Sequence, residues 1–160
     1  MDWDTYFINM AQLVSLKSKD TSTKVGCVIV GPENQILSTG FNGFPRGVIE
    51  DETQPLRWER PTKYMFCEHS ERNAVFNAAR HGIPLRGAIA YLNWIPIPCP
   101  DCARCFIQSG ITTIIGPDRP FAGKGDWSSI QSVSLPMLNE AGIKLITIPN
   151  IKMFVPLLLE

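Results

Sequence analysis

Two short strings in this chain combine residue types that bind metal ions and move protons. His69 and Glu71 stand two positions apart, and Cys99 and Cys102 stand three apart within the string Pro98-Cys99-Pro100-Asp101-Cys102. An imidazole and two thiolates are ligands that suit zinc, and a nearby carboxylate can transfer protons. Alone, His-x-Glu is usually an exposed helix start, and Pro-Cys-x-x-Cys can be half of a zinc knuckle, a redox pair or a cluster ligand.

The first pair is expected at the start of a helix. Residues two apart on a helix project about 200° apart around its axis, so His69 and Glu71 can face one ion only from a helix N-terminus. The range 70–80 reads as that helix, because Gly82 and Pro84 follow it as stop signals.

The two cysteines predict a second helix start. Pro100 stands at what would be the first helical position, which places Cys99 and Cys102 in the opening turn. Each helix N-terminus carries about half a positive charge, which lowers the pKa of a nearby thiol. Two helix starts would then face one metal ion, and three protein ligands would leave a fourth position open, as in a catalytic zinc site.

In this order and spacing, the H-x-E and P-C-x-x-C strings resemble the signature of zinc deaminases. The resemblance implies that His69, Cys99 and Cys102 hold a catalytic Zn²⁺ and that Glu71 is the general acid and base. Glu71 would take a proton from water at the metal, protonate the ring nitrogen beside the attacked carbon, and pass a proton to the departing amine. The products would be a carbonyl compound and ammonia.

The other cysteines and the second histidine have different expected roles. Cys105 extends the string to C-x-x-C-x-x-C, which resembles half of an iron–sulfur motif, but the fourth cysteine followed by proline is missing. We expect Cys105 in a buried helix position and Cys27 in a strand. Cys67 is expected in the core or behind the metal ligands. His81 suits a helix end, where the dipole favours it.

Composition limits the class of protein and its partners. The chain has 160 residues, enough for a single domain over 1–160, and Lys plus Arg equals Asp plus Glu at 15 each. This balance provides no global positive field, so a small substrate is favoured over nucleic acid. No apolar run approaches the roughly 18 residues of a membrane span, and the acidic start does not resemble a secretion signal. Five cysteines favour a reducing, cytoplasmic compartment.

Hydrophobic periodicity predicts the elements around these strings. Apolar residues at spacings of three and four indicate an amphipathic helix over 3–17, and two β-rich runs around the turn 31–34 indicate a hairpin. The expected strands cover 25–30, 35–40, 87–93, 111–115 and 144–148, and the later helices cover 70–80, 102–109 and 130–141. Strands that alternate with helices predict a layered α/β domain around a mixed five-stranded sheet.

Three further stretches resemble deoxycytidylate (dCMP) deaminases in particular. They are SLKSKD at 15–20, TKVGCVIV at 23–30 and STGFNGFPRG at 38–47, the last with a G-[YF]-N-G-x-P-x-G loop. The resemblance covers nearly the whole chain. It implies a three-layer α/β/α cytidine-deaminase-like fold and hydrolysis of dCMP to dUMP for thymidylate synthesis. It also implies a hexamer that is activated by dCTP and inhibited by dTTP with Mg²⁺.

The glycine-rich loop 40–47 could bring backbone N–H groups close to an anion or a sugar, although a plain turn is the alternative. The resemblance implies that Asn42 contacts the sugar and that the loop contributes to an effector site. The candidate substrate-binding residues are Thr23, Lys24, Val25, Asn42 and Ser70. The candidate effector-binding residues are Lys19, Gly40, Phe41, Asn42, Gly43, Phe44, Arg46 and Arg80.

Several of these assignments have alternatives in the sequence itself. We expect the monophosphate near Ser22, Thr23 and Lys24, but Lys24 could equally be a solvated residue before a strand. Arg80 could likewise be a solvated arginine at a helix end. Ser70 replaces the usual alanine of H-x-E, where mainly the backbone is expected to contribute.

Three segments carry further expectations. The string Asn93-Trp94-Ile95-Pro96-Ile97-Pro98 departs from the family pattern and alters the pocket wall at Ile95 and Pro96. The charged segment 48–64 either closes over a nucleotide or is a solvated loop. The apolar string 151–159 predicts an oligomer contact, unless it covers the core of its own chain.

Overall fold

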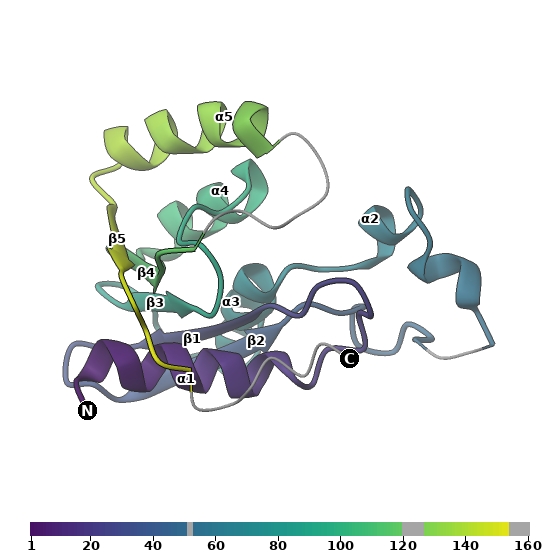
Figure 1. Ribbon diagram of the computed structural model, residues 1–160, viewed down its shortest axis with the longest axis horizontal. Coiled ribbons are helices and arrows are strands. Elements are labelled where there is room, and N and C mark those ends of the chain that lie inside the picture. Colours follow the sequence, from purple (N-terminus) through teal and green to yellow (C-terminus); the bar gives the residue numbers. More distant parts are fainter. Residues whose placement is uncertain (51–52, 120–126, 154–160) are drawn as a thin grey trace.

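A computed structural model describes residues 1–50, 53–119 and 127–153. A five-stranded sheet in the order β2-β1-β3-β4-β5 forms its centre (Figure 1). The strands are β1 (Gly26–Val30), β2 (Ile36–Phe41), β3 (Ile89–Leu92), β4 (Thr113–Pro117) and β5 (Lys144–Ile148). The helices are α1 (Trp3–Ser15), η1 (Pro55–Trp58), α2 (Lys63–Phe66), α3 (Ser70–Arg80), α4 (Pro100–Ser109) and α5 (Trp127–Glu140).

The sheet is mixed, as predicted. β1 pairs antiparallel with both β2 and β3, whereas β3, β4 and β5 run parallel to one another. The β1–β2 pair is the hairpin expected around 31–34. All five residues of β1 are buried, because helices cover both faces of the sheet, and this explains the continuous apolar run Cys27-Val28-Ile29-Val30.

Two separate cores give the domain three layers, which confirms the predicted α/β/α arrangement. On one face of the sheet, Phe7, Ile8 and Ala11 of α1 pack against Val28 and neighbouring strand residues. On the other face, α3, α4 and α5 contribute apolar side chains around Phe106. Figure 1 shows α1 on one side of the sheet and α3, α4 and α5 on the other.

Some predicted boundaries are wrong by two or three residues, and capping explains two of them. α1 ends at Ser15 rather than 17, because the N–H groups of Leu16 and Lys17 donate to carbonyls three residues back. β4 begins at Thr113 rather than 111, because the N–H of Ile111 caps α4 by donating to Phe106 O. α4 begins at Pro100, which is the first helical position expected from the cysteine string and lies two residues before the range 102–109; α5 begins three residues earlier than predicted.

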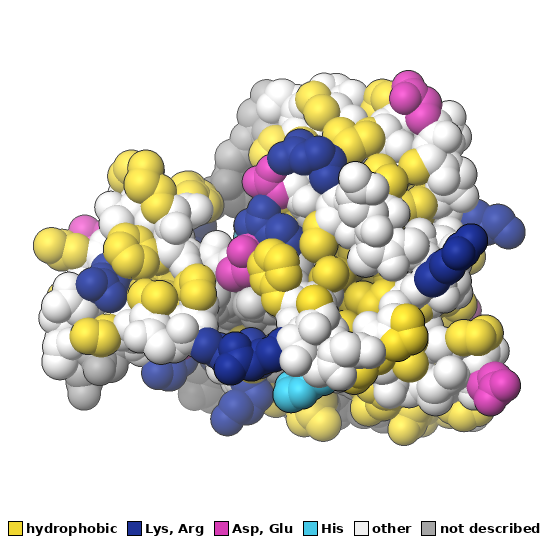
Figure 2. Space-filling view, turned by 180° about the vertical axis from the view of Figure 1, so that it is seen from behind, with side chains coloured by type: hydrophobic (Ala, Val, Ile, Leu, Met, Phe, Trp, Pro, Cys, Tyr) yellow, Lys and Arg dark blue, Asp and Glu magenta, His cyan; other side chains and the backbone are white. Residues whose placement is uncertain are grey.

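The segment 53–66, called the arm below, is mostly exposed to solvent but is not a simple connector. It contains η1 and α2 and projects from the body of the domain (Figure 1). Its base is held by Phe44, whose ring stacks on Trp58 at a centroid distance of 4.4 Å and lies 5.5 Å from Phe66. Figure 2 shows the projecting lobe from behind, with hydrophobic side chains on its surface.

The C-terminal apolar string is only partly described. Ile151 and Met153 pack against the core beneath α1, which agrees with the alternative that the string covers its own chain. The rest of the predicted oligomer contact, 154–159, lies outside the described residues. Within the described ranges, no helix is both long and apolar enough to cross a membrane.

Candidate metal centre and its pocket

Two helix starts bring three metal-binding side chains together. His69 is the N-cap residue of α3, Cys99 is the N-cap residue of α4, and Cys102 follows in the first turn of α4. The sulfur atoms of both cysteines lie 3.5 Å from Nδ1 of His69. Among the residues that the structure describes, this is the one group of three or more such side chains with ligand atoms within 4.8 Å of one another.

The spacing of these atoms fits a tetrahedral zinc ion. Zn–N bonds of about 2.0–2.1 Å and Zn–S bonds of about 2.3 Å place nitrogen and sulfur roughly 3.5 Å apart at a tetrahedral angle. Both measured distances from His69 Nδ1 have this value. The donor set of one imidazole and two thiols therefore matches zinc in type and in geometry.

The three ligand side chains of this cluster differ in how their pKa values are shifted. The hydrogen bond from the Cys102 thiol lowers the pKa of Cys99 to about 4, although burial opposes this change. The same contact and burial raise the pKa of Cys102 well above its ordinary value. The hydrogen bond with Cys99 raises the pKa of His69 to about 9. Because a metal must displace protons from Cys102 and His69, its affinity decreases as the pH falls.

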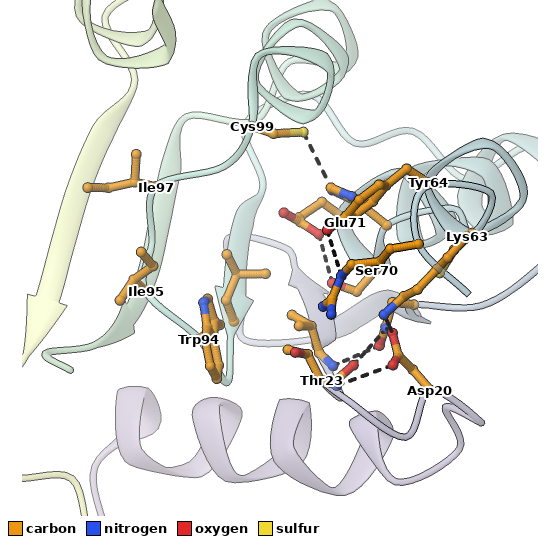
Figure 3. A pocket seen from close by; sticks show the side chains of 16 residues that line it. Asp20, Thr23, Lys63, Tyr64, Ser70, Glu71, Trp94, Ile95, Ile97 and Cys99 are labelled. Atoms are coloured by element: carbon orange, nitrogen blue, oxygen red, sulfur yellow. Dashed lines mark hydrogen bonds and ion pairs between the residues drawn. The ribbon is translucent and has the colours of Figure 1, made fainter. Parts of the chain in front are cut away.

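Glu71 lies beside the cluster with its carboxylate held by the preceding residue. Ser70 Oγ donates to Glu71 Oε2 over 2.8 Å, and both residues are buried. Their side chains point into the same pocket as Cys99 (Figure 3). The sequence predicts that Ser70 contributes mainly through its backbone, and the structure adds a contact of its hydroxyl with the Glu71 carboxylate.

The pocket has one apolar side and one polar side. Trp94, Ile95 and Ile97 form a wall opposite the Asp20–Lys63 pair, and Glu71 lies between the pair and Cys99 (Figure 3). Of the two residues expected to alter this wall, Ile95 lines the pocket, whereas Pro96 is buried and does not line it.

Asp20 is the centre of the polar side. Its carboxylate lies 2.5 Å from Lys63 Nζ and accepts hydrogen bonds from the backbone of Ser22 and Thr23. Burial raises the pKa of Asp20, but the hydrogen bond from Lys63 and those from Ser22 outweigh it and leave the pKa lowered. Lys63 Nζ also donates to Ser22 Oγ over 2.8 Å, so the arm is joined to the segment before β1.

The arm supplies pocket residues that the sequence did not indicate. Arg60, Lys63 and Tyr64 all line the pocket. Arg60 Nε donates to the Tyr64 hydroxyl over 2.8 Å, and its Nη2 lies 3.5 Å from Ser22 Oγ. The only sequence signal was the density of charge in a segment too long for a connector.

The predicted substrate residues are placed differently from one another. Thr23, Val25, Asn42 and Ser70 line the pocket, whereas Lys24 is exposed, does not line it and donates to Ser18 O. Both polar atoms of the Asn42 amide form hydrogen bonds within the protein. Its oxygen accepts from Val25 N over 2.8 Å, and its nitrogen donates to Asp20 Oδ2 and Thr23 O over 3.1 and 2.9 Å. Asn42 thus shapes the pocket wall.

Most residues of the predicted effector loop also pack or form hydrogen bonds within the protein. A Cβ on Gly40 would lie 2.3 Å from Ala74 N, so glycine lets β2 approach α3. Gly43 pairs with Glu68 through two backbone hydrogen bonds, and Phe44 N donates to the Glu50 carboxylate over 3.0 Å.

The basic effector candidates lie on the surface. Lys19 Nζ donates to Glu50 O over 2.8 Å, and Arg46 donates to Asn77 on α3. Lys19, Arg46 and Arg80 are exposed, and Phe41 is half-buried.

The remaining cysteines are free. Cys27 is buried in β1, and Cys105 is half-buried in α4. Cys67 lines the pocket, and burial raises the pKa of its thiol to about 12, so it stays protonated at neutral pH.

Comparison with known proteins gives a consistent result. Residues 1–116 match the model of the cytidine and deoxycytidylate deaminase zinc-binding region. An uncharacterised deaminase of Aliivibrio fischeri is 37% identical over 147 residues, which cover 92% of this chain and 94% of that protein. The deoxycytidylate deaminase of Homo sapiens is 36% identical over 121 residues, covering 72% of this chain but only 64% of the human enzyme.

Solved structures show the same fold. The dCMP deaminase of cyanophage S-TIM5 superposes with a TM-score of 0.66 at 23% identity, covering 91% of this chain and 96% of the phage protein. A second structure of that enzyme, in complex with dCMP and dUMP, gives a TM-score of 0.65.

Alanine at a ligand position is expected to remove bound zinc. His69→Ala or Cys102→Ala leaves two ligands, which are too few for a stable site. Cys105→Ala is the matched control, because it removes a thiol from the same helix but outside the cluster. Zinc should be measured by atomic absorption after gel filtration. Stoichiometric zinc in Cys102→Ala, or its loss in Cys105→Ala, would contradict the assignment.

Proposed function

Because the chain belongs to the cytidine and deoxycytidylate deaminase zinc-binding family, we propose that it hydrolyses dCMP to dUMP and ammonia. The observation that carries this proposal is the meeting of His69, Cys99 and Cys102 at zinc-ligand spacing beside the buried carboxylate of Glu71. A non-catalytic zinc module would have no use for that carboxylate in a pocket.

Glu71 moves the protons of the proposed reaction. His69, Cys99 and Cys102 would hold zinc, which would supply a Lewis acid that makes water acidic enough to react near neutral pH. Glu71 accepts a proton from the attacking water and delivers it to the ring nitrogen next to the amino-bearing carbon. It then takes the proton of the new hydroxyl group on that carbon and passes it to the leaving amine. The C–N bond breaks and a carbonyl forms, so dCMP and water become dUMP and ammonia. Ser70 keeps Glu71 oriented throughout.

The apolar wall suits a flat pyrimidine ring. Val25, Leu92, Trp94, Ile95 and Ile97 line the pocket on the side of the sheet and the loop that follows β3. Ligand pockets typically combine such an apolar lining with a few polar groups that fix orientation. The base would lie against this wall with its amino group toward the metal ligands, and the sugar toward Thr23.

The monophosphate would be bound by the arm and the segment before β1. Asp20 already neutralises Lys63 at 2.5 Å, so Lys63 brings little net charge to the pocket. Arg60 lines the same pocket and has no ion pair with an acidic group among the described residues. We therefore assign the phosphate to Arg60, whose Nη2 lies 3.5 Å from Ser22 Oγ, and this assignment replaces Lys24, which does not line the pocket.

The proposal also covers regulation by nucleotides, assembly and metabolic role. The resemblance of the loop 40–47 to that of dCMP deaminases supports activation by dCTP and inhibition by dTTP with Mg²⁺. Since amides in that loop bond within the chain, the triphosphate would be held by exposed basic groups, for which Lys19, Arg46 and Arg80 are the candidates. The same resemblance supports a cytoplasmic hexamer that supplies dUMP for thymidylate synthesis.

Glu71→Gln is expected to keep zinc and bind dCMP but lose turnover, because the amide keeps the shape and cannot shuttle protons. The fall in kcat should be about 10²- to 10⁴-fold. Glu140→Gln, at an exposed helix end, is the control and should behave like the unmodified protein. Ammonia release measures the rate. Activity above about a hundredth would show that Glu71 is not the acid–base group.

Arg60→Gln is expected to reduce selectivity for the nucleotide over the nucleoside. Loss of one charge-assisted hydrogen bond of about 1.5–3 kcal/mol should lower kcat/KM for dCMP roughly 10- to 100-fold and leave deoxycytidine nearly unaffected. Lys24→Gln removes a positive charge outside the pocket and should leave both values unchanged. If the unmodified protein used dCMP and deoxycytidine equally well, no phosphate site would be needed.

The effector proposal predicts that dCTP and dTTP move the dCMP saturation curve in opposite directions when Mg²⁺ is present. A coupling free energy of about 1–3 kcal/mol corresponds to a change of roughly 5- to 150-fold in apparent affinity. Steady-state rates and calorimetry should be measured on the same preparation. Superimposed curves without triphosphate binding would show that 40–47 is only a structural turn.

A further inference from the structure

A chain of ion pairs joins the two helix starts that carry the metal ligands. Arg72 in the first turn of α3 pairs with Glu68 and also with Asp101 in the first turn of α4, where Nη1 and Oδ2 lie 3.1 Å apart. Asp101 pairs in turn with Arg104 on its own helix. Figure 2 shows basic and acidic side chains alternating beside the hollow between the projecting lobe and the body.

One end of this chain reaches a ligand residue directly. Glu68 Oε1 accepts the backbone N–H of His69 over 3.0 Å as well as the Arg72 guanidinium. The backbone of Glu68 is itself fixed by its two hydrogen bonds with Gly43. Arg72 therefore connects a carboxylate that orients His69 to a carboxylate at the start of the helix that carries both cysteines.

The pairs differ in exposure in a way that separates their contributions. The side chains are 22% and 20% exposed in the Arg72–Glu68 pair, 22% and 56% exposed in the Arg72–Asp101 pair, and 58% and 56% exposed in the Arg104–Asp101 pair. Exposed ion pairs contribute little, and partly desolvated charges interact more strongly.

We propose that Arg72 is a positioning residue of the metal centre, which fixes the N-terminus of α4 relative to that of α3 so that the three ligands stand at zinc spacing. Residues that support metal ligands from outside typically change metal affinity by about 10- to 100-fold when they are replaced. The inference goes beyond the proposed reaction, because it concerns how the metal is held whatever the substrate.

The test compares Arg72→Gln with Arg104→Gln. Both variants remove a guanidinium bound to Asp101, but only the first breaks the connection between the helices. Zinc release into an excess of chelator should be about 10- to 100-fold faster in Arg72→Gln, and Arg104→Gln should match the unmodified protein. With Co²⁺ in place of zinc, Arg72→Gln should also show altered thiolate-to-cobalt and d–d absorption, which a change in stability alone would not produce.

Asp101→Asn is the second variant, because it breaks the connection from the α4 side at a residue that is more than half exposed. It should also release zinc faster than Arg104→Gln. Equal release from Arg72→Gln and Arg104→Gln would overturn the proposal, and so would an Asp101→Asn protein that matches the unmodified one. If Arg72→Gln did not fold, Asp101→Asn would decide the question. Release is measured without substrate, so failure of the dCMP assay would leave this result intact.

Discussion

Convergence of two helix N-termini on one point is the constraint on which the rest of this structure depends. One imidazole and two sulfur atoms must meet at about 3.5 Å, although His69 and Cys99 are 30 residues apart in sequence. Close backbone contacts on both sides make this possible. A Cβ on Gly40 would lie 2.3 Å from Ala74 N of α3, and a Cβ on Gly116 would lie 2.3 Å from Trp94 O in the loop that leads to α4. Glycine in β2 lets α3 lie close to the sheet, and glycine in β4 does the same for the loop before α4.

The features that the sequence predicted are those with local signals. Glycine and proline after α3 and proline at the start of α4 located these helices, and short β-rich runs located the strands. The spacing of His69 and Glu71 placed His69 at a helix start, and Pro100 placed Cys99 at another. The start of β4 was misplaced because Ile111 is apolar and β-branched, like a strand residue, yet its backbone caps α4. A backbone hydrogen bond that caps a helix cannot be recognised from the hydrophobicity of the residues that form it.

Features that depend on contacts between distant segments could not be predicted from the sequence. Lys63 and Ser22 are 41 positions apart, and only the folded arm brings the ammonium group to the hydroxyl and to Asp20. Helices as short as η1 and α2 are too brief to show a period, so the arm reads as a loop. The family resemblance implies that Asn42 contacts the sugar, but its three hydrogen bonds within the protein could be found only from coordinates.

The pocket is built from two separate parts of the fold, and this affects how its substrate specificity could change. The metal ligands and Glu71 belong to helix starts anchored in the sheet, whereas Arg60 and Lys63 belong to the arm, which is attached through Phe44 and the Asp20 pair. Loops tolerate changes in length and sequence far better than packed elements do. Changes in the arm could therefore alter which sugar or phosphate group is bound, while the metal ligands and Glu71 stay unchanged.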